Sequence, residues 1–276
     1  MNQTGSHIGS FARQRVARQL GVWQRVARQF VVPQLITPTL DFFLPPRCAT
    51  CDIVLARAPA LCGQCWSKLD FIDGPICNRT GAPLPFDLGP QTISLNAMRH
   101  PPAYHHARAA LYYTDTARVL IRRFKFHDRP ELANLMVPWL LRAGEKLLAH
   151  ADIIMPVPLH WTRLFGRRFN QSAELARKLA DLTGIDMQVE WLRRTRRTPQ
   201  QIGLTRADRR KNLRGAFTVP KKYYRFLRGK QVVLIDDVMT TGATVEACAK
   251  VLRRVGVAQI NVLTVARVVL PETVHI

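Results

Sequence analysis

The sequence predicts an α/β protein with a central parallel sheet flanked by helices, joined to a small N-terminal module held together by cysteines. Residues 232–235 form a continuous apolar run, which is typical of a strand buried on both faces of a parallel sheet. Residues 245–252 repeat apolar side chains at helical spacing directly afterwards. Two Cys-x2-Cys pairs, at 48–51 and 62–65, lie far from this region. At 276 residues the chain is long enough for one substantial core and one smaller module.

The helix predicted after the strand at 232–235 has a recognisable C-terminal end. A second strand is expected earlier in the chain. Arginines occupy the last turn of the predicted helix, and Gly256 follows as a typical helix end. Residues 152–157 form another apolar run, which leads into Pro156 and Pro158. Because proline removes a ladder donor and fixes the backbone, the strand should end there in a turn.

Two further helical segments are expected beside this sheet. Asn170 is a suitable N-cap for a helix whose apolar side chains recur at helical spacing over 175–182. Residues 120–132 interleave apolar and cationic side chains. One face of that segment should be buried while the other presents cations.

Two adjacent carboxylates, Asp236 and Asp237, end the strand predicted at 232–235, and a glycine-centred, hydroxyl-rich turn follows at 240–244. Ligands of open α/β sheets bind outside the carboxyl ends of the strands, and a turn entering a helix offers free N–H groups and a positive dipole end. Carboxylates suit a vicinal diol, and these donors suit a phosphate. The segment therefore predicts a ribose 5-phosphate site, and the competing interpretation is a solvated Asp-Asp turn.

The four cysteines of the N-terminal module have the spacing of two zinc knuckles. Cys48 and Cys51 form the first pair, and Cys62 and Cys65 form the second. Four thiolates close a tetrahedral zinc shell without an open position, so the metal would be structural. Disulfides are the alternative if the chain is exported. Cys77 stands apart and is expected to be a small buried side chain.

The charge balance points to polyanionic partners. The chain has 41 Lys and Arg against 19 Asp and Glu, a net charge of +22. Such an excess suits nucleic acid, anionic lipid or phosphorylated metabolites, although a generally basic proteome would also produce it. No apolar stretch approaches the roughly 18 residues that a membrane span needs, and no signal core is present. We therefore expect a cytoplasmic protein.

Three basic segments extend this interpretation. Residues 193–214 carry a single acid, Asp208, and are either a lid that orders over an anion or an unstructured surface loop. Residues 163–168 are either a diphosphate-binding loop or a solvated turn. Residues 1–40 contain no Asp or Glu. Residues 11–30 are expected to form a basic amphipathic helix that lies on an anionic membrane or on nucleic acid. The alternatives are that the extension is disordered or that it docks on the protein itself.

Residues 232–244, VVLIDDVMTTGAT, resemble the phosphoribosyl pyrophosphate (PRPP) motif of type I phosphoribosyltransferases. Together with the cysteine pairs, PVPLHWTRLFGRRFNQSAELARKLA and TRRTPQQIGLTRADRRKNLRGAF, this motif resembles the ComF family of competence-associated proteins over about residues 44–267. The resemblance implies a zinc-ribbon-like module at 41–90 and a type I phosphoribosyltransferase-like domain at 91–276, after an extension at 1–40. It also implies DNA uptake or DNA utilisation as the process.

The resemblance also implies roles for individual residues. Asp236 and Asp237 would bind the ribose hydroxyls, and the catalytic set would be completed by Lys125 and Arg210. The remaining PRPP contacts would come from the two loops, namely Thr240, Thr241, Gly242, Ala243, Thr244, Pro158, Leu159, His160 and Arg163. Mg²⁺ would accompany PRPP.

Two departures from the family pattern bear on these roles. Arg168 stands where the family usually has glycine, which alters that turn. Thr80 replaces a cysteine that would complete a third knuckle after Cys77, and four thiolates remain for zinc.

Two classes of function stay open at this stage. An enzyme would transfer the phosphoribosyl group of Mg-PRPP to a nitrogen acceptor, with pyrophosphate leaving. A binding protein would keep the pocket as a PRPP sensor or relic and hold single-stranded DNA, with other DNA-uptake proteins as further candidate partners. Phe124, Phe126 and Trp161 would then stack on bases, unless they belong to the core. The sequence identifies no acceptor pocket.

Overall fold

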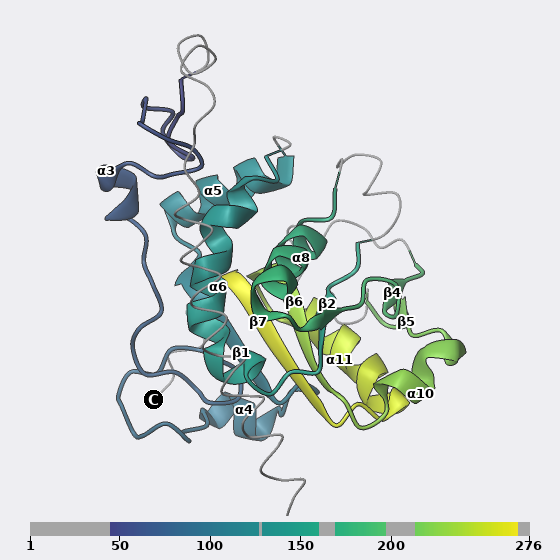
Figure 1. The fold of residues 1–276 in the computed structure, drawn as a ribbon. Coiled ribbons are helices and arrows are strands. Elements are labelled where there is room, and N and C mark those ends of the chain that lie inside the picture. The colour runs from purple at the N-terminus through teal and green to yellow at the C-terminus, as the bar shows by residue number, and fades with distance from the viewer. Residues whose placement is uncertain (1–44, 127–128, 160–168, 197–212, 270–276) are drawn as a thin grey trace, which may run out of the picture.

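The computed structural model describes residues 45–126, 129–159, 169–196 and 213–269. Five parallel strands form the central sheet in the order β1-β7-β6-β2-β3 (Figure 1). Their bounds are β1 His106–Tyr112, β2 Ile153–Pro156, β3 Asp186–Met187, β6 Gln231–Met239 and β7 Gln259–Arg267. The predicted parallel α/β fold is confirmed, because β6 lies between two parallel neighbours and its residues 232–235 are fully buried.

Helices cover both faces of the sheet. One core packs between the sheet and three helices, α5 Asp115–Phe126, α6 Leu132–Leu148 and α8 Gln171–Thr183. A second core packs on the opposite face beneath α11 Ala243–Val255. Neighbouring residues of β6 alternate between these cores, with Val233 in the first and Leu234 in the second. Adjacent side chains of a strand point to opposite faces, so both faces of β6 are covered.

Short elements complete the described part of the chain. They are α3 Gly63–Trp66, α4 Leu95–Arg99, a 3₁₀ turn η1 Lys221–Tyr223, α10 Tyr224–Leu227 and the antiparallel pair of β4 Arg193–Arg194 with β5 Phe217–Thr218. The ends of the predicted lid are therefore ordered, and its middle lies outside the described residues. No helix in the described ranges is long and apolar enough to cross a bilayer.

Sequence-based boundaries are confirmed for the helices and corrected for β6. Asn170 accepts hydrogen bonds from the N–H groups of Ser172 and Ala173, as a helix N-cap does, and Gly256 ends α11 with φ of 90°. The strand predicted to end before the acidic pair continues to Met239. Its partner β7 is equally long and keeps pairing with it, so Asp236 lies opposite Thr264.

The N-terminal module packs on α5 and α6 (Figure 1). Trp66 and Phe71 form an aromatic cluster with Trp139 of α6, with ring centroids 5.6–5.9 Å apart. Arg123 of α5 makes a bidentate contact with Asp52, at 2.5 and 2.6 Å. These contacts fix the module against the helices on one face of the sheet.

Candidate functional site

The acidic pair lies where the sheet loses one of the neighbours of β6. The pairing of β2 with β6 ends at Pro156 opposite Ile235, and the Val157 N–H donates the last hydrogen bond, to the Ile235 carbonyl at 2.9 Å. Beyond this point β7 is the only described strand that pairs with β6. Asp236 and Asp237 therefore lie beside the carboxyl end of β2, at the edge where ligands of α/β sheets bind.

Asp237 is paired with a cation from a different element. Lys125, near the end of α5, places its ammonium 2.8 Å from Asp237 Oδ1, and about four-fifths or more of each side chain is shielded from solvent. Gln171 is buried at the start of α8 and donates to the Lys125 carbonyl at 3.3 Å. The end of α5 and the start of α8 are thus held together above the acidic pair.

Asp236 has no such counter-ion among the described residues. Its Oδ1 accepts hydrogen bonds from the Ser172 hydroxyl at 3.0 Å and from the Asp237 N–H at 2.9 Å. Burial and the neighbouring Asp237 carboxylate raise the pKa of Asp236 to about 7, although Lys125 and these hydrogen bonds act in the opposite direction. Burial and the Asp236 carboxylate likewise raise the pKa of Cys248, which packs nearby on α11.

The turn after β6 presents donors at the start of α11. Gly242 adopts φ of 74° and ψ of 2°, a left-handed conformation that favours glycine, and is the N-cap. The Ala243 N–H donates to the Thr241 hydroxyl at 3.4 Å, and the Gly242, Thr244 and Val245 N–H groups have no acceptor in the described part of the chain. A helix of 13 residues directs its positive end at this turn, an arrangement that suits an anion.

The structure places most of the predicted site residues close together. Asp236, Asp237, Lys125 and the turn at 240–244 meet at the carboxyl end of β6. Pro158 is buried and Leu159 half-buried just after β2. His160, Arg163 and Arg210 lie outside the described residues, as does the N-terminal extension.

Two site residues were not singled out from the sequence. Ser172 hydrogen-bonds to Asp236, and Gln171 ties α8 to α5. The available signal was the predicted N-cap at Asn170, since it places residues 171 and 172 in the first helical turn. That turn faces the edge of the sheet where β2 ends.

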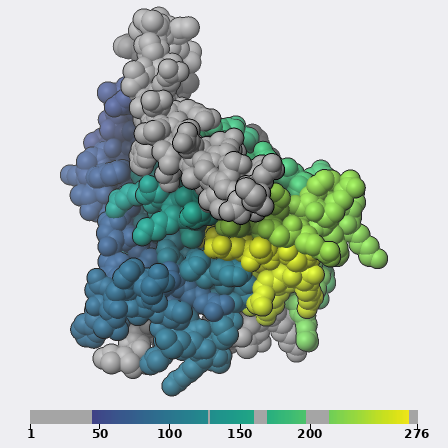
Figure 2. Space-filling view, turned by 60° about the horizontal axis from the view of Figure 1, so that its bottom comes forward, coloured from purple at the N-terminus to yellow at the C-terminus, as the bar shows by residue number. Residues whose placement is uncertain are grey.

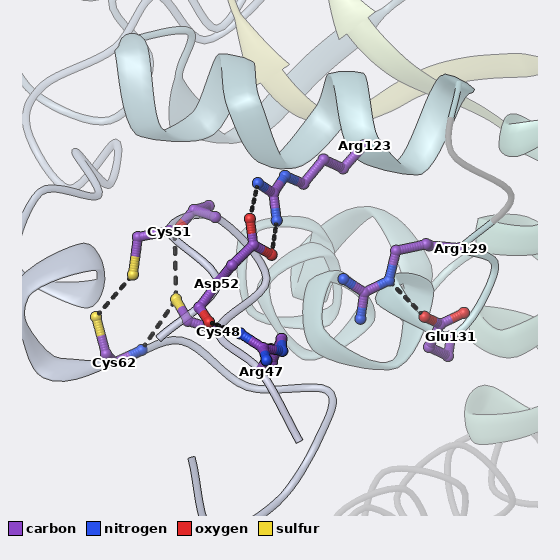
Figure 3. Close-up of polar contacts among 9 residues, drawn as sticks. Arg47, Cys48, Cys51, Asp52, Cys62, Arg123, Arg129 and Glu131 are labelled. Atoms are coloured by element: carbon purple, nitrogen blue, oxygen red, sulfur yellow. Dashed lines mark hydrogen bonds and ion pairs between the residues drawn. The ribbon is translucent and has the colours of Figure 1, made fainter. Parts of the chain in front are cut away.

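The four predicted zinc ligands come together in one cluster, and Figure 3 shows three of them, Cys48, Cys51 and Cys62. The Sγ atoms of Cys48, Cys51, Cys62 and Cys65 all lie within 4.8 Å of one another, and those of Cys51 and Cys62 are 3.6 Å apart. A tetrahedral zinc with sulfur ligands at about 2.3 Å places its sulfurs about 3.8 Å apart. The Cys62 N–H also donates to Cys48 Sγ at 3.4 Å. The cluster fits a structural zinc ion, which would be held by all four thiolates.

The turn after Cys77, where a third knuckle would lie, has a single cysteine and no set of four ligands. Cys77 is fully buried, as expected, and its Sγ accepts hydrogen bonds from the N–H groups of Thr80 and Ser94 at 3.5 and 3.3 Å. It packs with Ala82 and Ala97 in a small apolar cluster. Apolar packing and hydrogen bonds to sulfur therefore stabilise this turn.

Comparison with known proteins agrees with the two modules. Residues 39–94 match the double zinc ribbon domain family, and residues 172–269 match the phosphoribosyl transferase domain family. Competence protein F of Haemophilus influenzae is 31% identical over 232 residues, which cover 80% of this chain and 96% of that protein. The DNA utilization protein YhgH of Escherichia coli O157:H7 is 30% identical over 230 residues, which cover 81% of this chain and 98% of that protein.

A weaker similarity extends to solved structures. The purine phosphoribosyltransferase of Pyrococcus horikoshii is 21% identical over a match that covers 48% of this chain and 74% of that chain, with a TM-score of 0.32.

Proposed function

The chain belongs to the ComF family of phosphoribosyltransferase-like proteins, and we propose that it binds Mg-PRPP at the carboxyl end of β6 and transfers the phosphoribosyl group to a nitrogen acceptor. We place this activity in DNA uptake or DNA utilisation, as the names of its relatives suggest. We also place it in the cytoplasm, where thiols stay reduced for zinc binding. The proposed domain division is an extension at 1–40, a zinc module at 41–90 and a phosphoribosyltransferase-like domain at 91–276.

One juxtaposition supports this proposal above all. Two carboxylates of β6 lie next to unused N–H donors at the start of α11. The carboxylates of Asp236 and Asp237 accept hydrogen bonds from the two ribose hydroxyls, and the donors of residues 240–245 hold the 5-phosphate. A ligand with only a diol or only a phosphate would satisfy half of these groups.

The chain's own residues then assist departure of the diphosphate. Lys125 is held against Asp237 in the ligand-free protein. When the ribose hydroxyls bind Asp237, the ammonium is freed to offset negative charge on the diphosphate side, next to residues 158 and 159. Bound Mg²⁺ supplies further neutralisation of the leaving charge. Arg210, His160 and Arg163 remain proposed contacts.

Fragments of the ligand test the diol and phosphate halves of the site separately. Ribose 5-phosphate and 2-deoxyribose 5-phosphate differ by the one hydroxyl that the acidic pair is proposed to recognise. Each sugar phosphate is titrated calorimetrically against the zinc-loaded full chain. We expect the deoxy sugar to bind at least about tenfold more weakly, since a hydrogen bond to a charged group contributes about 1.5–3 kcal/mol. Equal affinities would contradict the diol assignment.

Turnover is tested with a pyrophosphate-release assay. PRPP, Mg²⁺ and a panel of nucleobases and amines are supplied to the parent chain and to Asp237→Asn. Release that depends on one acceptor and falls in the variant supports transfer. Binding of PRPP without release across the panel favours the second candidate.

The second candidate is a single-stranded-DNA-binding component of DNA uptake that retains the pocket as a PRPP sensor or relic. The observation that favours it is the net charge of +22. Four cations of one short surface segment have no acidic partner among the described residues, namely Lys221, Lys222, Arg225 and Arg228. Contact with other DNA-uptake proteins, and of residues 11–30 with a membrane, belongs to the same proposal.

A further inference from the structure

The segment between β5 and β6 is aromatic and cationic and contains no acidic residue. Its sequence over 219–230 is VPKKYYRFLRGK. It folds as η1 and α10, which stand out from the body on the side away from the zinc module (Figures 1 and 2). We call six of its solvent-facing side chains the α10 patch, which consists of Lys221, Lys222, Tyr224, Arg225, Phe226 and Arg228. Lys230 is exposed as well, but it lies 3.8 Å from Asp152 and is not counted in the patch.

Trp191 holds the rings of this segment in place. It stacks on Tyr223 with centroids 5.3 Å apart and planes 20° apart, and it contacts Phe226 at 5.6 Å and 30°. Phe226 is still 43% exposed, and Tyr224, which Trp191 does not support, is 40% exposed. Phe226 therefore offers an exposed ring on a fixed support to a planar ligand, at a small cost in side-chain entropy, and Tyr224 adds a second exposed ring close by in the sequence.

The cations of the α10 patch have no carboxylate partner in the part of the chain that the structure describes. A hollow of about 660 Å³ is lined by four of these cations together with Tyr224. Arg225 lies over the Phe226 ring at 4.6 Å. The nearest acids are already engaged within the described chain, because Glu190 beside Trp191 pairs with Arg193 at 3.0 Å and Asp152 accepts from the Gln231 N–H at 2.8 Å.

We propose that the α10 patch binds single-stranded nucleic acid, with Tyr224 and Phe226 stacking on bases and the four cations contacting phosphates. Stacking needs unpaired bases, which a duplex does not offer. An anionic bilayer would favour exposed aliphatic side chains, and both Val219 and Leu227 of this segment are buried. Of the predicted stackers, Phe124 is fully buried and is excluded, Phe126 is 61% exposed at the end of α5, and Trp161 lies outside the described residues. Tyr224 and Phe226 differ from Phe126 in lying within a group of cations that has no carboxylate partner in the described chain.

This surface is separate from the candidate PRPP site. The patch precedes the first residue of β6, Gln231, whereas Asp236 and Asp237 lie near its other end. Five residues at about 3.3 Å each put roughly 17 Å of strand between Gln231 and Asp236. The inference deepens the second candidate function, and it is independent of PRPP binding.

The test measures binding of fluorescein-labelled dT20 to the zinc-loaded full chain by anisotropy over a range of salt. Lys221→Gln with Arg225→Gln is compared with Arg118→Gln with Arg177→Gln. The second pair removes the same charge, but its arginines are already paired with Asp115 and with Glu174 and Asp181 on helices across the sheet. Loss of two phosphate contacts should lower the slope of log affinity against log salt by about 1.4 in the patch variant only.

The aromatic half is tested with Tyr224→Leu and Phe226→Leu. The parent should bind dT20 about tenfold or more tightly than an abasic chain of equal length, because a stacked base contributes about 1–3 kcal/mol. The double variant should lose this preference. Circular dichroism and calorimetry with PRPP on the same variants show whether the fold and the other site are retained.

Each remaining outcome counts against the proposal. Equal slopes in the two charge variants would mean that net charge alone attracts the strand. An unchanged base preference in the aromatic variant would remove the stacking role. Binding of the patch to phosphatidylserine vesicles without a change in dT20 affinity would assign it to membranes instead. If the parent does not bind dT20 at all, the second candidate function fails, whereas PRPP binding is unaffected.

Discussion

Asp236 should destabilise the ligand-free fold at neutral and alkaline pH. Its carboxylate is half-buried, adjoins that of Asp237, and receives hydrogen bonds without a counter-ion of its own in the described chain. Between the usual carboxyl pKa of 3.8 and the raised value of about 7, the folded protein holds a proton that the unfolded chain has released. The free energy of unfolding therefore falls as pH rises through this window.

Asp236→Asn removes this cost and keeps the acceptor for Ser172. Each tenfold change in acidity corresponds to about 1.4 kcal/mol, so full ionisation costs at most about 4 kcal/mol. Because Asp236 as a whole residue is only half-buried, we expect a gain of about 1–3 kcal/mol in the free energy of unfolding at pH 8. The gain should shrink to about a third of that value at pH 5, where the folded Asp236 is protonated but the unfolded carboxyl, with its usual pKa of 3.8, is still mostly ionised.

Urea unfolding followed by circular dichroism at pH 5 and pH 8, in buffer with zinc, measures this difference. Asp237→Asn is the matched control. It breaks the ion pair with Lys125 and leaves the ammonium unpaired, so it should lower stability at pH 8 by about 1–3 kcal/mol. No gain from Asp236→Asn at pH 8, or an equal gain at both pH values, would refute the buried-charge reasoning.

Three further outcomes are expected. Affinity for Mg-PRPP should rise between pH 6 and pH 8, because Asp236 accepts hydroxyl hydrogen bonds best when ionised, and calorimetry of Asp236→Asn should show no such rise from this group. Elemental analysis should find one zinc per chain, and two zinc ions per chain would contradict the single four-thiolate cluster. Cys62→Ser should lose the zinc, and the fluorescence of Trp66 should show that its packing is lost as well. Gly81→Ala should lower the free energy of unfolding by about 2 kcal/mol or more, since the φ of Gly81 is 65° and a Cβ there would collide with the Ala107 carbonyl oxygen. Gly89→Ala is the control for the same urea assay. It should cost less, because Gly89 has a φ of 95° but lies in open space.

Much of the fold follows from local patterns. A run of four apolar residues predicted β6, helical spacing predicted α11, and the side chain of Asn170 predicted the start of α8, because each signal is confined to one element. The cysteine cluster followed from spacing, since two knuckles close one tetrahedron. These features depend on residues that are close in sequence.

The remaining features depend on contacts between distant segments. β6 passes through the acidic pair because β7 is equally long and continues to pair with it, which no pattern within β6 reveals. Ser172 reaches Asp236 only because α8 begins beside the end of β2. The aromatic support of the α10 patch likewise depends on Trp191, more than 30 residues before Phe226.

The most direct test of the central claim is a calorimetric titration of the zinc-loaded full chain with PRPP and Mg²⁺. The parent is compared with the double variant Asp236→Asn, Asp237→Asn, after circular dichroism has shown that the variant is folded. Binding by the parent and its loss in the folded variant is the predicted result. Absence of binding by the parent, or equal binding by both proteins, would contradict the ribose-phosphate site at the end of β6.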